Sequence, residues 1–147
     1  MRVHGFSRYT TLMALLALSA AALAAGSFPQ MVAEVPFAFV AADQQLPSGH
    51  YSVWRVTDMG GPLMMRNRHD GTVVFIACRR PLAAQKKEGA LPKLVFHRYG
   101  DRYFLAQVWL SSSGTAGFDL PPSQEEREYV DSEVRYARVV IDGRSAR

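Results

Sequence analysis

Hydrophobic and polar residues alternate with a period of two along much of the chain, which is the pattern of a half-buried β-strand. The first such segment, Val32–Val40, places Val35, Phe37 and Phe39 on one face. Pro36 lies inside it and predicts an edge position or a bulge, because proline cannot donate to a ladder. Five later segments also have the composition of strands: Tyr51–Thr57, Leu63–Arg68, Thr72–Arg79, Lys93–Tyr99 and Arg102–Leu110.

Turn signals separate these segments. Asp70-Gly71 predicts a tight hairpin, and Gly100-Asp101 predicts a second one. Thr72–Arg79 follows the first turn and is apolar on both faces, so we expect it at the centre of a sheet. Pro81–Pro92 and Ser111–Pro122 carry no periodic pattern and predict loops.

The period changes at Ser123. Ser123 followed three residues later by Glu126 is a capping box, which predicts the start of a helix over Gln124–Glu133. Tyr136–Ile141 fits either a continuation of this helix or a last strand, because its end is β-branched. A helical stripe suited to docking on a sheet is formed by Val130, Val134, Ala137 and Ile141.

These patterns predict an all-β, mainly antiparallel domain with one C-terminal amphipathic helix. The expected form is a small β-sandwich or barrel of about six to seven strands. The strands follow one another too closely for the long crossovers that a parallel sheet requires.

The N-terminal segment has the three parts of a secretory signal peptide. Arg2 and Arg8 give a basic start, Thr11–Ala25 is almost pure Leu, Ala and Met, and Ala22-Leu23-Ala24 is a small-x-small cleavage pattern. The apolar run is shorter than the about 20 residues that span a bilayer. We therefore expect residues 1–24 to be removed near Ala24, leaving 25–147 as one exported domain, periplasmic or extracellular.

Charge and composition narrow the class further. The 147 residues carry a formal net charge of +4, two units of which belong to Arg2 and Arg8 in the predicted leader. Basic residues gather between Arg55 and Arg102, and acidic residues between Asp119 and Glu133, so the two regions are expected to attract one another. We expect no nucleic-acid partner, and contact with the membrane only through the leader during export.

The search for chemistry gives weak candidates. Three histidines outside the leader, His50, His69 and His97, are the only imidazoles available to a metal site, and none forms a local ligand pair. His50 and His69 fit exposed turn positions, and His97 fits a half-buried, hydrogen-bonded position. The single Cys78 lies in the most apolar segment and fits a small buried side chain better than a reactive thiol. We expect no cofactor and assign no catalytic residue.

The densest polar and aromatic stretch is a candidate surface for a ligand or partner, because arginine and tyrosine together suit anionic or stacked groups. A structural alternative is an ordinary hairpin whose aromatic residues pack across the two strands. The residues of this candidate surface are His97, Arg98, Tyr99, Asp101, Arg102 and Tyr103.

Three segments resemble the motifs of a family of small exported bacterial β-proteins. Val35–Val40 is similar to its IPF-F strand, Leu46–Val53 to its LPAG-Y-V hairpin, and Lys93–Phe104 to its LVFHRYGDRYFL hairpin. Ser48 stands where the family has Ala, and His50 where it has Glu. The resemblance covers nearly all of residues 25–147 and implies a fold and export, but it carries no activity.

Two functional hypotheses remain. The first is a non-enzymatic exported β-domain that binds a small ligand or an envelope or protein partner, or has a structural role in the envelope. The alternative is a metal-dependent or hydrolytic protein that uses His97 and Asp101 with a second histidine. The oligomeric state stays open.

Overall fold

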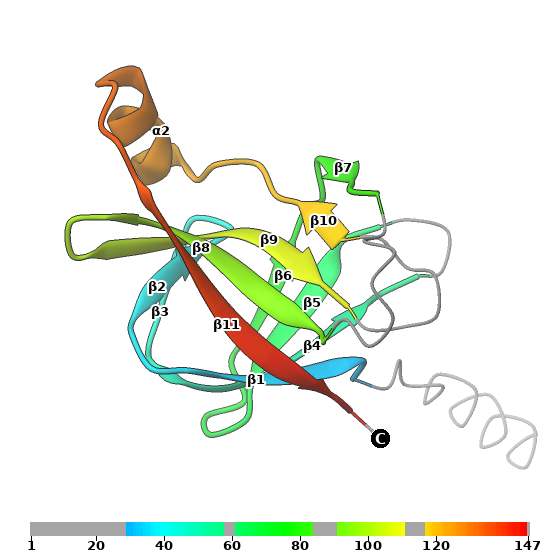
Figure 1. The fold of residues 1–147 in the computed structure, drawn as a ribbon. Coiled ribbons are helices and arrows are strands. Elements are labelled where there is room, and N and C mark those ends of the chain that lie inside the picture. Colours follow the sequence, from blue (N-terminus) through cyan, green and yellow to red (C-terminus); the bar gives the residue numbers. More distant parts are fainter. Residues whose placement is uncertain (1–28, 58–60, 84–90, 111–116, 147) are drawn as a thin grey trace, which may run out of the picture.

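The computed structural model describes residues 29–57, 61–83, 91–110 and 117–146, so the predicted leader lies outside the described residues. The described chain forms a mixed, nearly closed, barrel-like sheet with one short helix (Figure 1). This structure confirms the all-β class and takes the form of a barrel. Within the described ranges, no helix is long and apolar enough to cross a membrane.

Eleven strands and helix α2 follow one another in the described chain. Their bounds are β1 Met31–Val35, β2 Phe39–Ala41, β3 Gln44–Leu46, β4 Gly49–Arg55, β5 Leu63–Asn67, β6 Val73–Ile76, β7 Arg80–Pro81, β8 Lys93–Tyr99, β9 Arg102–Trp109, β10 Gly117–Asp119, α2 Gln124–Asp131 and β11 Ala137–Ser145. The main sheet path runs β3-β2-β9-β8-β11-β1-β4-β5-β6, and β10 joins β9 to β7.

The expected number of six to seven strands was wrong, since the described residues form eleven. The expected strand Val32–Val40 divides at Pro36 into β1 and β2. The expected loop Ser111–Pro122 contains β10, and the expected loop Pro81–Pro92 begins within β7. Strands of two or three residues are too short to show a period, so the pattern could not reveal them. One pair is parallel, β2 with β9 at Val40 and Phe104, which makes the sheet mixed.

β6 is the end strand of the sheet path, not the central strand that its apolar pattern predicted. Val74 and Ile76 face the core, but Val73 is 39% exposed and Phe75 57% exposed. β6 is therefore apolar on both faces without being buried on both. One face packs on the core, and the other is an exposed apolar surface.

The C-terminal segment turns into a strand. β11 lies between β8 and β1, which settles the open alternative for Tyr136–Ile141 in favour of a strand. The helix begins as predicted but ends at Asp131, and Val130 and Val134 are both exposed. The predicted docking stripe was therefore wrong, because two of its four members belong to the strand, not the helix.

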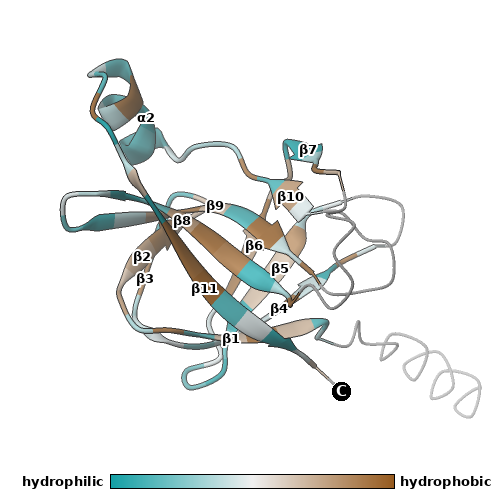
Figure 2. Cartoon of the chain, viewed as in Figure 1, coloured by the Kyte–Doolittle hydropathy of each residue, from teal (hydrophilic) through white to brown (hydrophobic). Residues whose placement is uncertain are grey.

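The barrel interior is filled by large side chains. Ten of the twelve largest fully buried residues belong to this main core: Tyr51, Phe39, Phe96, Met31, Leu63, Met65, Ile76, Leu94, Val35 and Val53. The central brown segments of β8, β9 and β11 in Figure 2 show how this apolar character continues across neighbouring strands. Phe39 contacts Tyr51 and Phe96 edge to face, with ring centroids 5.2 and 5.3 Å apart, which adds specific packing to area burial.

Candidate functional site

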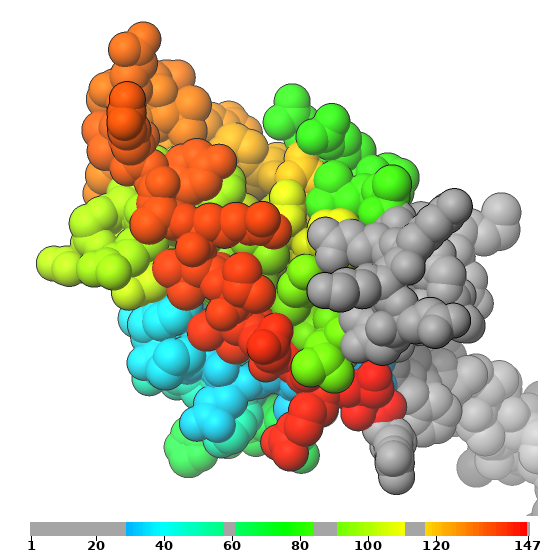
Figure 3. Space-filling model, in the orientation of Figure 1, coloured from blue at the N-terminus to red at the C-terminus, as the bar shows by residue number. Residues whose placement is uncertain are grey.

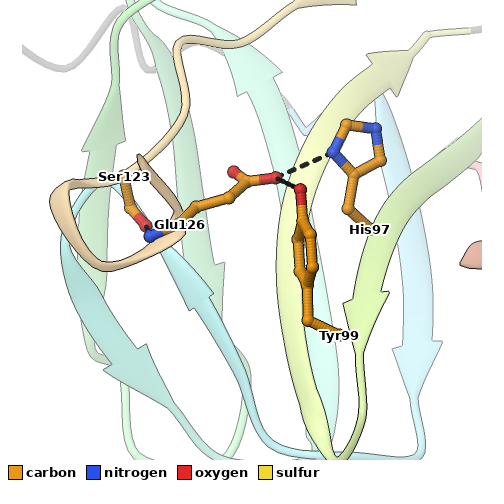
Figure 4. Close-up of polar contacts among 4 residues, drawn as sticks. All are labelled: His97, Tyr99, Ser123 and Glu126. Carbon is orange, nitrogen blue, oxygen red and sulfur yellow. Dashed lines mark hydrogen bonds and ion pairs between the residues drawn. The ribbon is translucent and has the colours of Figure 1, made fainter. Parts of the chain in front are cut away.

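Helix α2 stands at one end of the barrel, close to the β8–β9 hairpin (Figures 1 and 3). Ser123 caps its N-terminus with a hydroxyl that accepts from the Glu126 N–H at 3.1 Å, as the capping box predicts. The Glu126 carboxylate is not turned back to the helix start. It extends to the outer face of the sheet, where His97 and Tyr99 lie (Figure 4).

Glu126 joins the helix to β8. Its Oε1 lies 2.8 Å from His97 Nδ1 and accepts from the Tyr99 hydroxyl at 3.4 Å. Glu126 is 3% exposed, whereas the His97 side chain is 26% exposed. A buried carboxylate needs such partners because its desolvation is otherwise unfavourable. His97 is the half-buried, hydrogen-bonded histidine that the sequence suggested.

Aromatic rings surround this polar contact and form a second, smaller core on the outside of the barrel. Tyr129 of α2 stacks on Tyr99 at a centroid distance of 4.9 Å, and both rings lie near Phe104. Tyr136, at the start of the C-terminal strand segment, stacks on His97 at 3.9 Å. A buried acid and an aromatic stack therefore both attach the helix to the barrel.

The electrostatics follow from this burial. Burial is the largest cause that raises the pKa of Tyr99, to about 12, and the Glu126 carboxylate raises it further by its charge and its hydrogen bond. The Arg102 pKa is raised because its guanidinium donates to Glu125. That pair is bidentate, with Nε–Oε1 at 2.8 Å and Nη2–Oε2 at 2.7 Å.

The six residues of the candidate surface do not face one way. His97 and Tyr99 lie under α2, and Arg102 binds its Glu125. Tyr103 is half-buried against the main core and stacks on Phe37. Arg98 lies over Tyr103 and donates to Gly100 O, and Asp101 is exposed in the turn. Most of these side chains therefore serve internal contacts.

The ion pairs confirm that the basic middle and acidic C-terminal regions attract one another. Arg80 with Asp119 and Arg102 with Glu125 are two such pairs, and His97 with Glu126 is a third when the imidazole is protonated. Two arginines of the basic region therefore pair with acidic residues of the same chain.

The histidines lie in separate surroundings. His50 is exposed on β4 and His69 is exposed after β5, while His97 faces Glu126. In the part of the chain that the structure describes, no group of three or more His, Cys, Asp or Glu side chains is placed to hold a metal ion. The imidazole and carboxylate of His97 and Glu126 resemble the base and orienting acid of a hydrolase, but a nucleophile is also needed. Among the described residues, no hydroxyl or thiol hydrogen-bonds to His97.

A cleft of about 170 Å³ lies between the end of β6, strand β9 and the segment that leads into α2. Its apolar walls come from Ile76 at the end of β6 and the following Ala77, from Leu105 of β9, and from Leu120 and Pro121. Asp43, Glu126 and Arg127 also line it, so part of the cleft is polar. Ligand pockets of enzymes and carriers commonly enclose roughly 300–1,000 Å³, so this cleft has room for a side chain rather than for a cofactor.

Sequence reasoning missed the central role of Glu126. It identified the residue only as part of a cap, because its partner His97 lies 29 residues earlier in the chain. The sequence did show acidic residues at the helix start and basic residues in the β8–β9 hairpin, which indicates a contact between the two. It does not show which of the carboxylates is buried.

Comparison with protein-family models, curated proteins and solved structures found no match for the chain. The class of the molecule is therefore defined by its own structure: a mixed, nearly closed β-barrel with a short helix attached to its outer face.

Proposed function

We propose that the protein is an exported, non-enzymatic binding domain that contacts a partner through the outside of its barrel. The observation that carries this proposal is the filled interior, in which Tyr51, Phe96 and Met65 are each no more than 1% exposed. A carrier barrel needs a lined cavity, whereas a filled barrel has only its outer surface to offer.

The contacts of the chemically interesting residues support the same conclusion. His97 and Tyr99 bind the carboxylate that docks α2, and Arg102 is paired with Glu125. These groups stabilise the fold, and their engagement leaves the enzymatic alternative, with His97, Asp101 and a second histidine, without a supporting arrangement. A substrate hydrolysis that disappears in Asp101→Asn would reverse this preference.

Export is tested by recovering the protein from a bacterium that expresses the whole chain. We expect the envelope or external fraction to hold a form that begins near residue 25. A product that keeps residues 1–24, or that stays in the cytoplasm with the leader intact, would contradict the exported part of the proposal.

Partner binding is tested by placing a photo-crosslinking amino acid at single exposed positions of the exported protein. Phe75, Tyr136 and Val140 serve because each is at least 45% exposed, and because Phe75 lies on β6 whereas the other two lie at and near the start of β11. We expect a discrete adduct at one position that an excess of unlabelled protein suppresses. Absence of a suppressible adduct at every position, in protein shown to be folded, would contradict partner binding.

A further inference from the structure

The outer edge of β6 presents unpaired backbone groups. Asn67 N–H donates to Thr72 O at 2.8 Å next to the β5–β6 turn, so the hydrogen-bonded pairs of this ladder fall at every second residue after Thr72. Met65 pairs with Val74 in this way, and the backbone N–H and C=O groups of Val73 and Phe75 therefore point away from β5. Among the described residues, no strand pairs with that edge.

The side chains at this edge are also exposed and apolar. Val73 and Phe75 are 39% and 57% exposed, and neither a lysine nor a proline interrupts β6. The opposite end of the sheet path differs, because β3 is three residues long and begins with two exposed glutamines. Natural proteins commonly protect edge strands in the way of β3. The edge of β6 is exposed and apolar, so it is suited to pairing with a further strand.

An apolar stripe extends from this edge across the outside of the barrel. Trp54 of β4 is opposite Met64 of β5, and Met64 is opposite Phe75 of β6. Trp54 and Met64 are each partly exposed. Aromatic residues and methionine are enriched at protein interfaces, where they supply contact area.

The charges around the edge are mainly positive. Arg66 lies opposite Val73 on the outward face of β5, Arg68 follows at the hairpin, and Arg79 comes three residues after β6; all three are exposed. Asp70 is the acidic residue of the hairpin turn, and its carboxylate accepts from Thr72 N–H. The edge therefore favours a negatively charged occupant.

We propose that the edge of β6 binds an extended, acidic segment of a partner protein, which adds to the sheet as a further strand. Backbone hydrogen bonds with Val73 and Phe75 would hold the segment, and its outward apolar side chains would extend the Trp54–Met64–Phe75 stripe. Acidic residues at its ends would meet Arg66 and Arg79. This inference rests on the proposed function and names the partner's chemistry and mode of binding.

The cleft near the end of β6 fits the same mode. Ile76 and Ala77 form one of its walls and Leu105 and Leu120 another, so it begins where β6 ends. An apolar side chain of the added segment has room there. Specificity would then come from this side chain, and affinity from the backbone.

The test uses purified protein without its leader and a short synthetic peptide of alternating valine and threonine with glutamates at both ends. Val73→Pro removes an edge donor while leaving the β5 ladder intact, and we expect it to weaken binding about tenfold, the effect of one or two hydrogen bonds. Phe75→Glu and Arg66→Gln should each weaken binding as well. Val140→Glu is the matched control, because Val140 is 45% exposed on β11, a strand paired on both edges.

Isothermal titration measures binding, and circular dichroism with thermal unfolding checks that each variant is folded. Equal binding of a peptide with lysines in place of glutamates would overturn the acidic partner. Equal binding by Val73→Pro, or no binding by the unaltered protein, would overturn strand addition. Concentration-dependent dimers that Phe75→Glu abolishes would assign the edge to a second copy, and binding to anionic vesicles without peptide binding would assign it to a membrane; either result would overturn the proposal.

Failure of this inference is distinct from failure of the proposed function. A suppressible photo-adduct at Tyr136 or Val140, with none at Phe75, would keep partner binding and place it away from β6. Absence of adducts at all three positions would instead contradict partner binding itself.

Discussion

His97 of β8 and Glu126 of α2 are bonded through Nδ1 and Oε1 at 2.8 Å, across 29 residues of sequence. The same oxygen accepts from Tyr99, so one buried carboxylate fixes the helix to two positions on one strand. Buried polar contacts have strict geometry, because an unpaired partner has an unfavourable free energy. The pair therefore helps to fix the position of α2 on the sheet, together with the Arg102–Glu125 pair.

Glu126→Ala is expected to lower the free energy of unfolding by about 1–3 kcal/mol, because it leaves the Tyr99 hydroxyl and the His97 ring without their acceptor. Glu126→Gln should lower it less, since an amide oxygen still accepts a hydrogen bond. Urea unfolding measures the change. Glu128→Ala, an exposed position on the same helix, is the control, and an equal loss there would contradict the role of the buried carboxylate.

Tyr99 should make stability fall at alkaline pH. Its pKa is about 12 in the folded chain, against 10.0 for a free tyrosine, mainly because the ring is buried and then because of the Glu126 charge. The unfolded chain therefore loses this proton first. The contribution is fully present below pH 10.0 and is lost as the pH rises through about 12. Urea unfolding across that pH range should show a smaller fall in the free energy of unfolding for Tyr99→Phe than for the unaltered protein. An equal fall in the two proteins would contradict this role of Tyr99.

Some of this architecture was readable from the sequence because it depends on neighbours along the chain. The Asp70-Gly71 hairpin joins β5 and β6 as predicted, with Gly71 at φ +78°, a region where glycine is favoured. The start of α2 was likewise set by Ser123 and the acidic first turn. These signals are local, so one sequence is enough to reveal them.

Other features depend on what a segment meets in space. The composition of β6 does not state which strands flank it, and an exposed apolar face has the same pattern as a buried one. Glu126 has the sequence signature of a cap, although its carboxylate serves the sheet. Such long-range contacts leave no periodic trace, so the sequence alone could not choose between a binding surface and internal packing for His97 and Arg102.

Ser123→Ala tests the helix cap. The Ser123 hydroxyl accepts from Glu126 N–H, and loss of such a cap lowers stability by typically about 1 kcal/mol. We expect a lower thermal unfolding midpoint and weaker helical circular dichroism. Ser132→Ala, at the other end of α2, is the matched control, because that residue caps through its backbone N–H rather than its side chain. Equal effects of the two substitutions would contradict side-chain capping at Ser123.

Cys78 should react slowly with alkylating reagents while the protein is folded. Burial is the largest influence on its thiol and raises the pKa, although a backbone hydrogen bond from Leu63 and the charge of Arg55 act in the opposite direction. Since the thiolate is the nucleophile, a raised pKa leaves less reactive sulfur near neutral pH. Partial burial against the main core also limits access. Alkylation followed by mass spectrometry should be markedly slower in the folded protein than in urea, and equal rates in the two conditions would show that neither the raised pKa nor the packing protects Cys78.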